Sequence, residues 1–88
     1  MGKKFNDTLK YLGNSYSSAI IDLEEVIYRK INDFEIEISG LNSYGRYNVT
    51  LYLWKDRQIV KTIPDIHSKE ELAKHLDIVV SECSLNQD

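Results

Sequence analysis

The chain has 88 residues, of which 42% are hydrophobic and 28% are charged, and its formal net charge is −3. This length suits one globular domain with a thin core, so we expect residues 1–88 to form a single domain. The mild acidity argues against general nucleic-acid binding, which needs a basic surface, and direct contact with nucleic acid is therefore not expected. A negative net charge is compatible with docking onto a basic protein.

Cys83 is the only cysteine, so no disulfide can form within the chain. Polar residues follow Lys3 and Lys4, which is unlike a secretion signal, and no apolar run has the length of a membrane span. These features predict a protein of the cytoplasm that does not contact membranes.

Residues 5–31 have the pattern of an amphipathic helix, because hydrophobic residues recur at alternating intervals of four and three from Phe5 to Val26. The run from Gly13 to Ser18 interrupts this pattern, since glycine costs about 1 kcal/mol in a helix interior and asparagine and serine also disfavour helix. Two interpretations remain open. One is a single helix of about 25 residues; the other, which we favour, is a short helix to Leu12 and a main helix over Ser17–Ile31.

A single helix of that length would extend beyond a sheet whose strands span about 20 Å. The overhanging end would need a partner, for which a second copy of the same helix is one candidate. A structural or regulatory module that forms a homodimer through its N-terminal helix is therefore one functional hypothesis.

The segment from Phe34 to Ile63 predicts three strands. Hydrophobic and polar residues alternate over Phe34–Ser39 and over Tyr47–Trp54, which gives each strand two different faces. A third strand over Ile59–Ile63 ends before Pro64, which cannot donate a hydrogen bond to a neighbouring strand.

The turn over residues 55–58 leaves the register of the second hairpin open. Either Trp54 or Leu53 can lie opposite Ile59, and the choice reverses the faces of the third strand. The pattern of hydrophobic residues does not decide between them.

The last predicted element is a helix that begins after Ser68, where Ser68 and Glu71 have the spacing of a capping box. Its hydrophobic stripe consists of Leu72, Leu76, Val79 and Cys83. Residues 1–4 and 84–88 are expected to fray. The predicted fold is thus α+β in the order α-β-β-β-α, with a three-stranded antiparallel sheet and helices packed on one face.

No set of residues predicts catalysis. His67, His75 and Cys83 lack the spacing of a metal site, and the chain has no nucleophile–base pair or phosphate-binding loop. Glu35 and Glu37 would lie roughly 6.5–7 Å apart on one strand face, but a solvated face is the simpler interpretation of this pair. We therefore expect no enzymatic activity, no metal and no cofactor.

Aromatic residues cluster around the middle predicted strand, where Tyr52 and Trp54 would face away from the helices. Tyrosine and tryptophan are enriched in binding hot spots, but they are also favoured in strands for packing alone, and both explanations remain open. An aromatic sheet face also suits single-stranded RNA, although carboxylates would share this one. If a partner protein binds here, the predicted contact residues are Tyr44, Tyr47, Tyr52, Trp54, Asp56 and Arg57, with Glu35 and Glu37 beside them.

Residues 27–40, which read IYRKINDFEIEISG, resemble the helix-to-strand junction of a small prophage-encoded anti-CRISPR protein. That protein is also short, acidic and α-β-β-β-α in order, and the resemblance covers about a sixth of the chain. It implies a phage protein with an anti-defence function, an inhibitor that binds a host nuclease complex in the host-cell cytoplasm. Inhibitors of this family use surface carboxylates to occupy the site where the nuclease reads duplex DNA, and the resemblance assigns no individual residue here.

Overall fold

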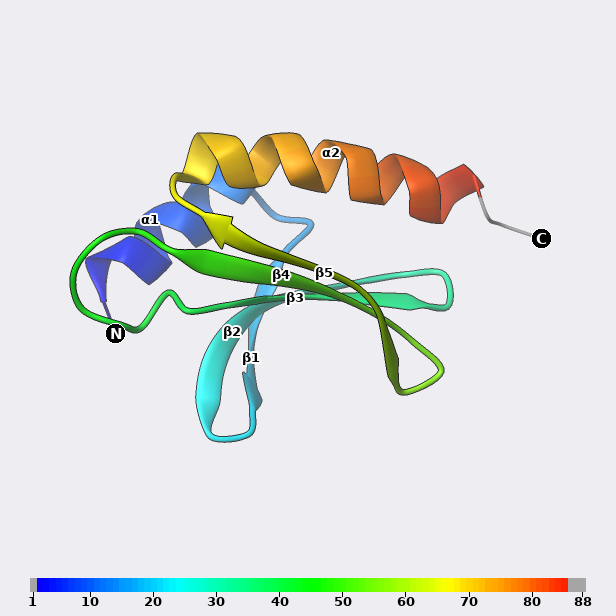
Figure 1. The fold of residues 1–88 in the computed structure, drawn as a ribbon, viewed down its shortest axis with the longest axis horizontal. Helices are drawn as coiled ribbons and strands as arrows, with labels where there is room; N and C mark the ends of the chain where they lie inside the picture. The colour runs from blue at the N-terminus through cyan, green and yellow to red at the C-terminus, as the bar shows by residue number, and fades with distance from the viewer. Residues whose placement is uncertain (1, 86–88) are drawn as a thin grey trace.

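The computed structural model describes residues 2–85, which form two helices and one antiparallel sheet of five strands. The strands pair in chain order, so that β1 and β5 are the two edges of the sheet. Figure 1 shows α1 and α2 on the same side of the sheet, with the β1–β2 turn on the other side. In chain order the elements are α1 Lys3–Leu12, β1 Ser17–Ile21, β2 Glu24–Ile31, β3 Phe34–Ser39, β4 Val49–Lys55, β5 Gln58–Ile66 and α2 Lys69–Leu85.

The main helix expected over Ser17–Ile31 is wrong, as is the single long helix, because this segment forms the β1–β2 hairpin. Asp22 and Leu23 both have positive φ, 51° and 68°, as a tight two-residue turn of type I′ requires. The isoleucine, valine and tyrosine of the segment favour strands, and pairing with β3 outweighs their helical spacing. The predicted break is confirmed, since α1 ends at Leu12.

The sheet therefore has five strands and not the three that were predicted, although β3 has the predicted bounds. β4 begins two residues later than expected, at Val49, and β5 continues through Pro64 to Ile66. β5 tolerates the proline because it is an edge strand with no neighbour on its outer side.

The register of the β4–β5 hairpin places Trp54 opposite Ile59, the first of the two alternatives. The next pair is Leu53 and Lys61, so the register shifts and Val60 is an extra residue in β5. Such a bulge increases the local twist of a sheet.

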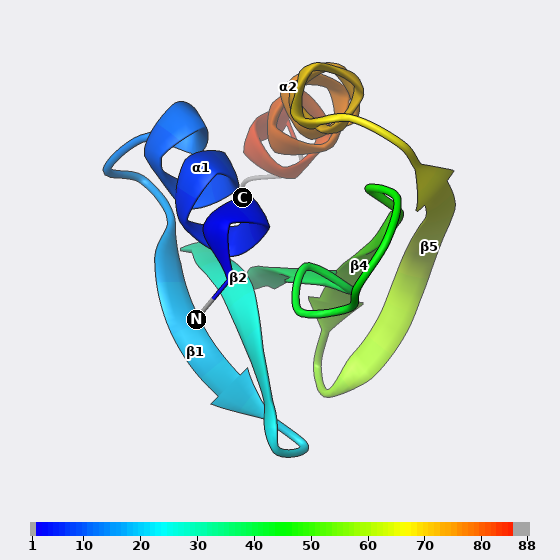
Figure 2. The same ribbon diagram turned by 90° about the vertical axis from the view of Figure 1, so that its left-hand side faces the viewer.

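The hydrophobic core lies between the helices and one face of the sheet (Figure 2). The predicted stripe of α2 is confirmed, since all four of its members are buried. Full burial of each large hydrophobic side chain contributes about 1.5–3 kcal/mol. The strands contribute Ile27, Ile36, Ile38, Leu51 and Leu53 among others, α1 contributes Phe5, and α2 contributes Leu72, Leu76, Val79 and Cys83.

The start of α2 follows the predicted capping pattern in part. The Glu71 backbone N–H donates to the Ser68 hydroxyl at 3.0 Å, but the Glu71 carboxylate accepts from the His67 backbone N–H at 2.8 Å instead of returning to Ser68. Of the ends expected to fray, Lys3 and Lys4 belong to α1 and Ser84 and Leu85 to α2, while Met1 and residues 86–88 lie outside the described residues. Within residues 2–85, neither helix combines the length and the apolarity needed to cross a bilayer.

Candidate functional site

The face of the sheet turned away from the helices contains a hollow of about 320 Å³. Strand pairing sets Glu37 opposite Tyr52 on this face, and the β1–β2 hairpin closes one side of the space. We call this hollow the acidic hollow, because three of the side chains that line it are carboxylates. The lining residues are Ile21, Asp22, Glu24, Glu37, Ser39, Tyr52, Trp54 and Ile59.

Glu37 is the most buried carboxylate of the acidic hollow, with only 8% of its surface exposed. The Trp54 indole Nε1–H donates to its Oε1 at 3.0 Å. Burial raises the pKa of Glu37; the Trp54 hydrogen bond opposes this, and the charges of Glu24 and Asp22 add to the rise. The ionised form of Glu37 is therefore costly in the free protein, and a cation placed in the hollow would stabilise it.

Glu24 is held in place by the end of β3. The Ser39 hydroxyl lies 3.0 and 2.9 Å from its two carboxylate oxygens, and the Gly40 backbone N–H donates to Oε2 at 2.9 Å. Gly40 has φ +102°, and a Cβ added there would lie 2.8 Å from the Asn48 carbonyl oxygen. These contacts fix the β1–β2 hairpin to β3 and so fix the wall of the acidic hollow.

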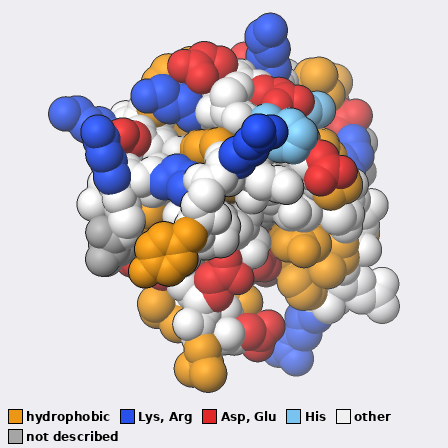
Figure 3. Space-filling view, turned by 60° about the vertical axis from the view of Figure 1, so that its left-hand side comes forward, with side chains coloured by type: hydrophobic (Ala, Val, Ile, Leu, Met, Phe, Trp, Pro, Cys, Tyr) orange, Lys and Arg blue, Asp and Glu red, His pale blue; other side chains and the backbone are white. Residues whose placement is uncertain are grey.

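The aromatic floor of the hollow is partly exposed, since Tyr52 and Trp54 are neither buried nor fully open to solvent. Exposed hydrophobic residues lie beside it: Leu23 at the β1–β2 turn is 98% exposed, and Ile59 and Val60 on β5 are about half exposed. Figure 3 shows acidic side chains set between hydrophobic ones on the lower half of the molecule, away from the helices. The combination of aromatic, aliphatic and acidic groups is suited to contact with a basic, partly apolar surface.

The structure brings together only some of the predicted contact residues. Tyr52, Trp54 and Glu37 line the acidic hollow, and Glu35 lies on the same face, where its carboxylate accepts a 2.7 Å hydrogen bond from the Tyr28 hydroxyl. This bond, with burial and the Glu35 charge, raises the pKa of Tyr28.

The other predicted residues lie elsewhere. Asp56 and Arg57 form the exposed β4–β5 turn, and Tyr44 is fully exposed in the β3–β4 loop at the opposite end of β4. Tyr47 packs against the core on the helix side, where its hydroxyl lies 2.8 Å from the Thr8 hydroxyl. Burial raises the pKa of Tyr47, the Thr8 hydrogen bond lowers it, and the Glu70 charge raises it.

Sequence reasoning missed the part of the hollow that comes from the β1–β2 hairpin, namely Ile21, Asp22 and Glu24. The signal that was available is the order of residues 20–27, in which Ile20-Ile21 and Val26-Ile27 flank four residues that contain three carboxylates. Two β-branched pairs around a polar turn are typical of a hairpin.

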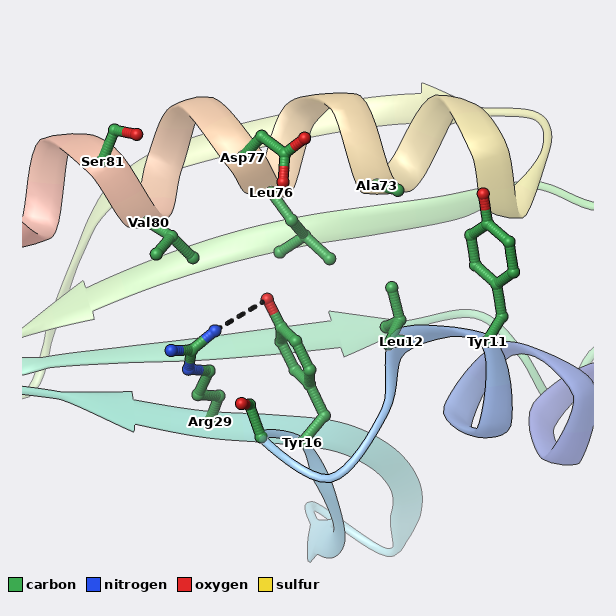
Figure 4. Close-up of a pocket in the computed structure, with 10 residues that line it drawn as sticks. Tyr11, Leu12, Tyr16, Arg29, Ala73, Leu76, Asp77, Val80 and Ser81 are labelled. Atoms are coloured by element: carbon green, nitrogen blue, oxygen red, sulfur yellow. Dashed lines mark hydrogen bonds between the residues drawn. The ribbon is translucent and has the colours of Figure 1, made fainter.

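A second hollow, of about 530 Å³, lies on the helix side of the sheet and is drawn in Figure 4. We call it the helix-side groove. Inside it the Arg29 guanidinium lies 5.1 Å from the centre of the Tyr16 ring, and its NH1 donates to the Tyr16 hydroxyl at 3.4 Å. The lining residues are Tyr11, Leu12, Ser15, Tyr16, Arg29, Ala73, Leu76, Asp77, Val80 and Ser81.

The groups with catalytic or metal-binding potential are dispersed. Within residues 2–85, no three side chains of histidine, cysteine, aspartate or glutamate lie together as metal ligands would. Cys83 is buried, and burial raises the pKa of its thiol; the Glu82 charge adds to this, while Lys61 and Arg29 oppose it. The thiol is therefore protonated at neutral pH and a weak nucleophile.

Comparisons of the chain with protein-family models, curated proteins and solved structures give no match. Residues 27–40, which carry the resemblance to an anti-CRISPR protein, form the end of β2, a turn at Asn32 and Asp33, and β3. The junction is therefore strand-to-strand in this chain, and the helix expected there is absent.

Proposed function

We propose that this chain is a non-enzymatic inhibitor that binds a host protein through the acidic hollow. The proposed target is a CRISPR nuclease complex, and the role is that of an anti-defence protein encoded by a phage or prophage and active in the host cytoplasm. The main support is the pairing of a nearly buried carboxylate, Glu37, with the partly exposed rings of Trp54 and Tyr52 in one hollow.

The chemistry of the hollow favours a basic side chain of the partner as its occupant. A guanidinium can stack on Trp54 or Tyr52 and at the same time approach the carboxylates of Glu37, Glu24 and Asp22. Nucleases that hold nucleic acid present such basic side chains on the surfaces that contact phosphates. Occupation of those residues would displace the nucleic acid.

Leu23 provides an independent argument for a contact at this end of the sheet. It is 98% exposed and has φ +68°, a conformation that glycine and asparagine adopt more easily. Neither burial nor turn geometry favours leucine at this position. A hydrophobic anchor that inserts into a partner accounts for both features.

The homodimer hypothesis has lost its basis in the sequence. It required a continuous helical stripe from Phe5 to Val26, but α1 ends at Leu12 and residues 17–31 form the β1–β2 hairpin.

The test is an in vitro cleavage assay with purified CRISPR nuclease complexes of bacterial hosts, each incubated with the chain before target DNA is added. We expect the wild-type chain to block at least one complex, and Tyr52→Ala with Trp54→Ala to weaken the inhibition by about 30-fold or more, because each ring is a candidate hot spot. Far-UV circular dichroism and the melting temperature show whether the variant is folded. Tyr11→Ala, which removes an exposed ring on the helix side, is the matched control and should inhibit like wild type.

Leu23→Asn separates binding from folding. Asparagine suits the left-handed turn, so the free energy of unfolding should stay the same or rise by up to about 1 kcal/mol. Inhibition should nevertheless weaken by about tenfold or more. Unchanged cleavage by every complex with the wild-type chain, or full inhibition by both variants, would contradict the proposal.

A further inference from the structure

The helix-side groove is separate from the acidic hollow, because it lies on the opposite face of the sheet. Figure 4 shows its layout: Tyr11 and Tyr16 stand apart with Leu12 between them, α2 forms the opposite wall, and Arg29 extends from β2 beside Tyr16. A hollow of about 530 Å³ has the size of many small-molecule sites, which range over about 300–1,000 Å³.

Among the polar groups of the groove, Arg29 has the most hydrogen-bond donors without a partner in the described residues. A guanidinium has about five N–H donors, and here one of them makes a long hydrogen bond to the Tyr16 hydroxyl. Among residues 2–85 the one ion pair joins Lys61 and Glu82, so Arg29 has no carboxylate partner within the described chain. A partly buried guanidinium in this state favours an anion with which it can share two parallel hydrogen bonds.

The rest of the groove is suited to an apolar body. Leu76 is almost completely buried, and Leu12 and Val80 pack partly buried against the core, so together they offer a hydrophobic wall. The rings of Tyr11 and Tyr16 offer flat faces for contact with another ring.

Two further charges define which anion fits. The Lys69 ammonium lies 5.2 Å from the centre of the Tyr11 ring at one end of the groove, and Asp77 on α2 lines the groove. Lys69 lies outside the lining of the groove, but its charge adds to that of Arg29 and so favours a negative ligand, while the Asp77 carboxylate disfavours a second negative charge on that ligand.

We infer that the helix-side groove binds a small organic monoanion with a flat, apolar body, such as an aromatic carboxylate or sulfonate. The anionic group contacts the Arg29 guanidinium and the Tyr16 hydroxyl, and the apolar body lies against Leu12, Leu76 and Val80. This site is independent of the proposed inhibitory face, so either one can be wrong without the other.

The probe for this test is 8-anilinonaphthalene-1-sulfonate, a fluorescent aromatic monoanion, paired with N-phenyl-1-naphthylamine, which has the same rings without the sulfonate. We expect saturable binding of the sulfonate at one site per chain, with a shift of the Arg29 Nε–Hε signal in a ¹⁵N correlation spectrum. Arg29→Met keeps an unbranched stem for packing and removes the charge. It should weaken binding of the sulfonate by tenfold or more and leave binding of the neutral probe unchanged or tighter, because a charge-assisted hydrogen bond is lost only with the sulfonate.

Asp77→Asn should tighten binding of the sulfonate about two- to threefold, because it removes a negative charge from the groove. Circular dichroism establishes that both variants are folded. No saturable binding of the sulfonate to the wild-type chain would overturn the inference. Equal weakening of both probes by Arg29→Met, or no weakening of either, would overturn it as well.

Discussion

The two hollows lie on opposite faces of one sheet and differ in charge. The acidic hollow places Asp22, Glu24 and Glu37 around an aromatic floor, whereas the helix-side groove places one base, Arg29, and one acid, Asp77, beside an apolar wall. Glu24 and Arg29 belong to the same strand, β2, and an odd separation of five residues sends their side chains to opposite faces. A single layer of strands thus separates the two proposed binding sites.

The two hollows also differ in how their charges are satisfied. In the acidic hollow, Glu24 accepts from two donors, the Ser39 hydroxyl and the Gly40 backbone N–H, and Glu37 accepts from Trp54, so both carboxylates are held in the free protein. In the groove, Arg29 makes one hydrogen bond and one ring contact with described residues, both to Tyr16. The first arrangement suits the proposed contact with a partner protein, and the second leaves donors available for the proposed small ligand.

The largest expected effect concerns the contribution of each face to stability. Ile27 is fully buried in the core on the helix side, and Ile27→Ala should lower the free energy of unfolding by about 3–4 kcal/mol in urea titrations. Ile20→Ala, at an exposed position of β1, is the control and should change it by less than about 0.5 kcal/mol. Similar losses for both variants would show that the helix-side core does not dominate stability.

A smaller loss is expected where the acidic hollow is built. Gly40→Ala should cost about 2–3 kcal/mol, because a side chain at φ +102° is strained and its Cβ would lie 2.8 Å from the Asn48 carbonyl oxygen. Gly45→Ala shares the positive φ, 93°, but meets no atom within 4 Å, so it should cost only about 1 kcal/mol. If chemical denaturation gives the two variants equal stability, the close contact at Gly40 is not as described.

The third effect depends on pH and distinguishes the acidic hollow from the groove. Because burial raises the pKa of Glu37, the folded chain keeps this proton to higher pH than the unfolded chain does. Stability is therefore lost as the pH rises from the ordinary glutamate pKa of about 4.3 through the raised value of the folded state. Glu37→Gln still accepts the Trp54 hydrogen bond and lacks this loss, so its melting temperature relative to wild type should increase from pH 4 to pH 7. A difference between the two proteins that does not vary with pH would contradict this prediction.

The smallest effect is expected for the ion pair between β5 and α2. The Lys61 ammonium and the Glu82 carboxylate lie 2.9 Å apart, but both side chains are well exposed, at 39% and 48%. Lys61→Met should therefore change the free energy of unfolding by less than about 1 kcal/mol, and added salt should reduce the difference further. A loss above 2 kcal/mol in urea titrations would mean that this contact stabilises α2 more than an exposed pair can.

The sequence was sufficient where local pattern and tertiary packing agree. β3 has the predicted bounds because Phe34, Ile36 and Ile38 alternate with polar residues, and α2 follows from its cap and its stripe. The same alternation predicted that Tyr52 and Trp54 share the face away from the helices.

The sequence was insufficient for β1 and β2, where spacing and packing disagree. Val26 and Ile27 are consecutive and both fully buried, but only Ile27 belongs to the core cluster on the helix side. Because side chains on both faces are buried, hydrophobic and polar residues no longer alternate along the strand. The spacing of the hydrophobic residues then also fits a helix. Because Asp22 and Glu24 belong to this hairpin, the wall of the acidic hollow that they form was not predicted either.

The place of α2 after all five strands affects the order in which the core is closed. Until its 17 residues dock on the sheet, Ile36, Ile38 and Leu51 have only α1 above them. Hairpins form within about 1–10 μs, so the sheet can pair before α2 docks. A sheet that pairs first exposes a bare apolar surface, and such surfaces make folding intermediates prone to aggregation.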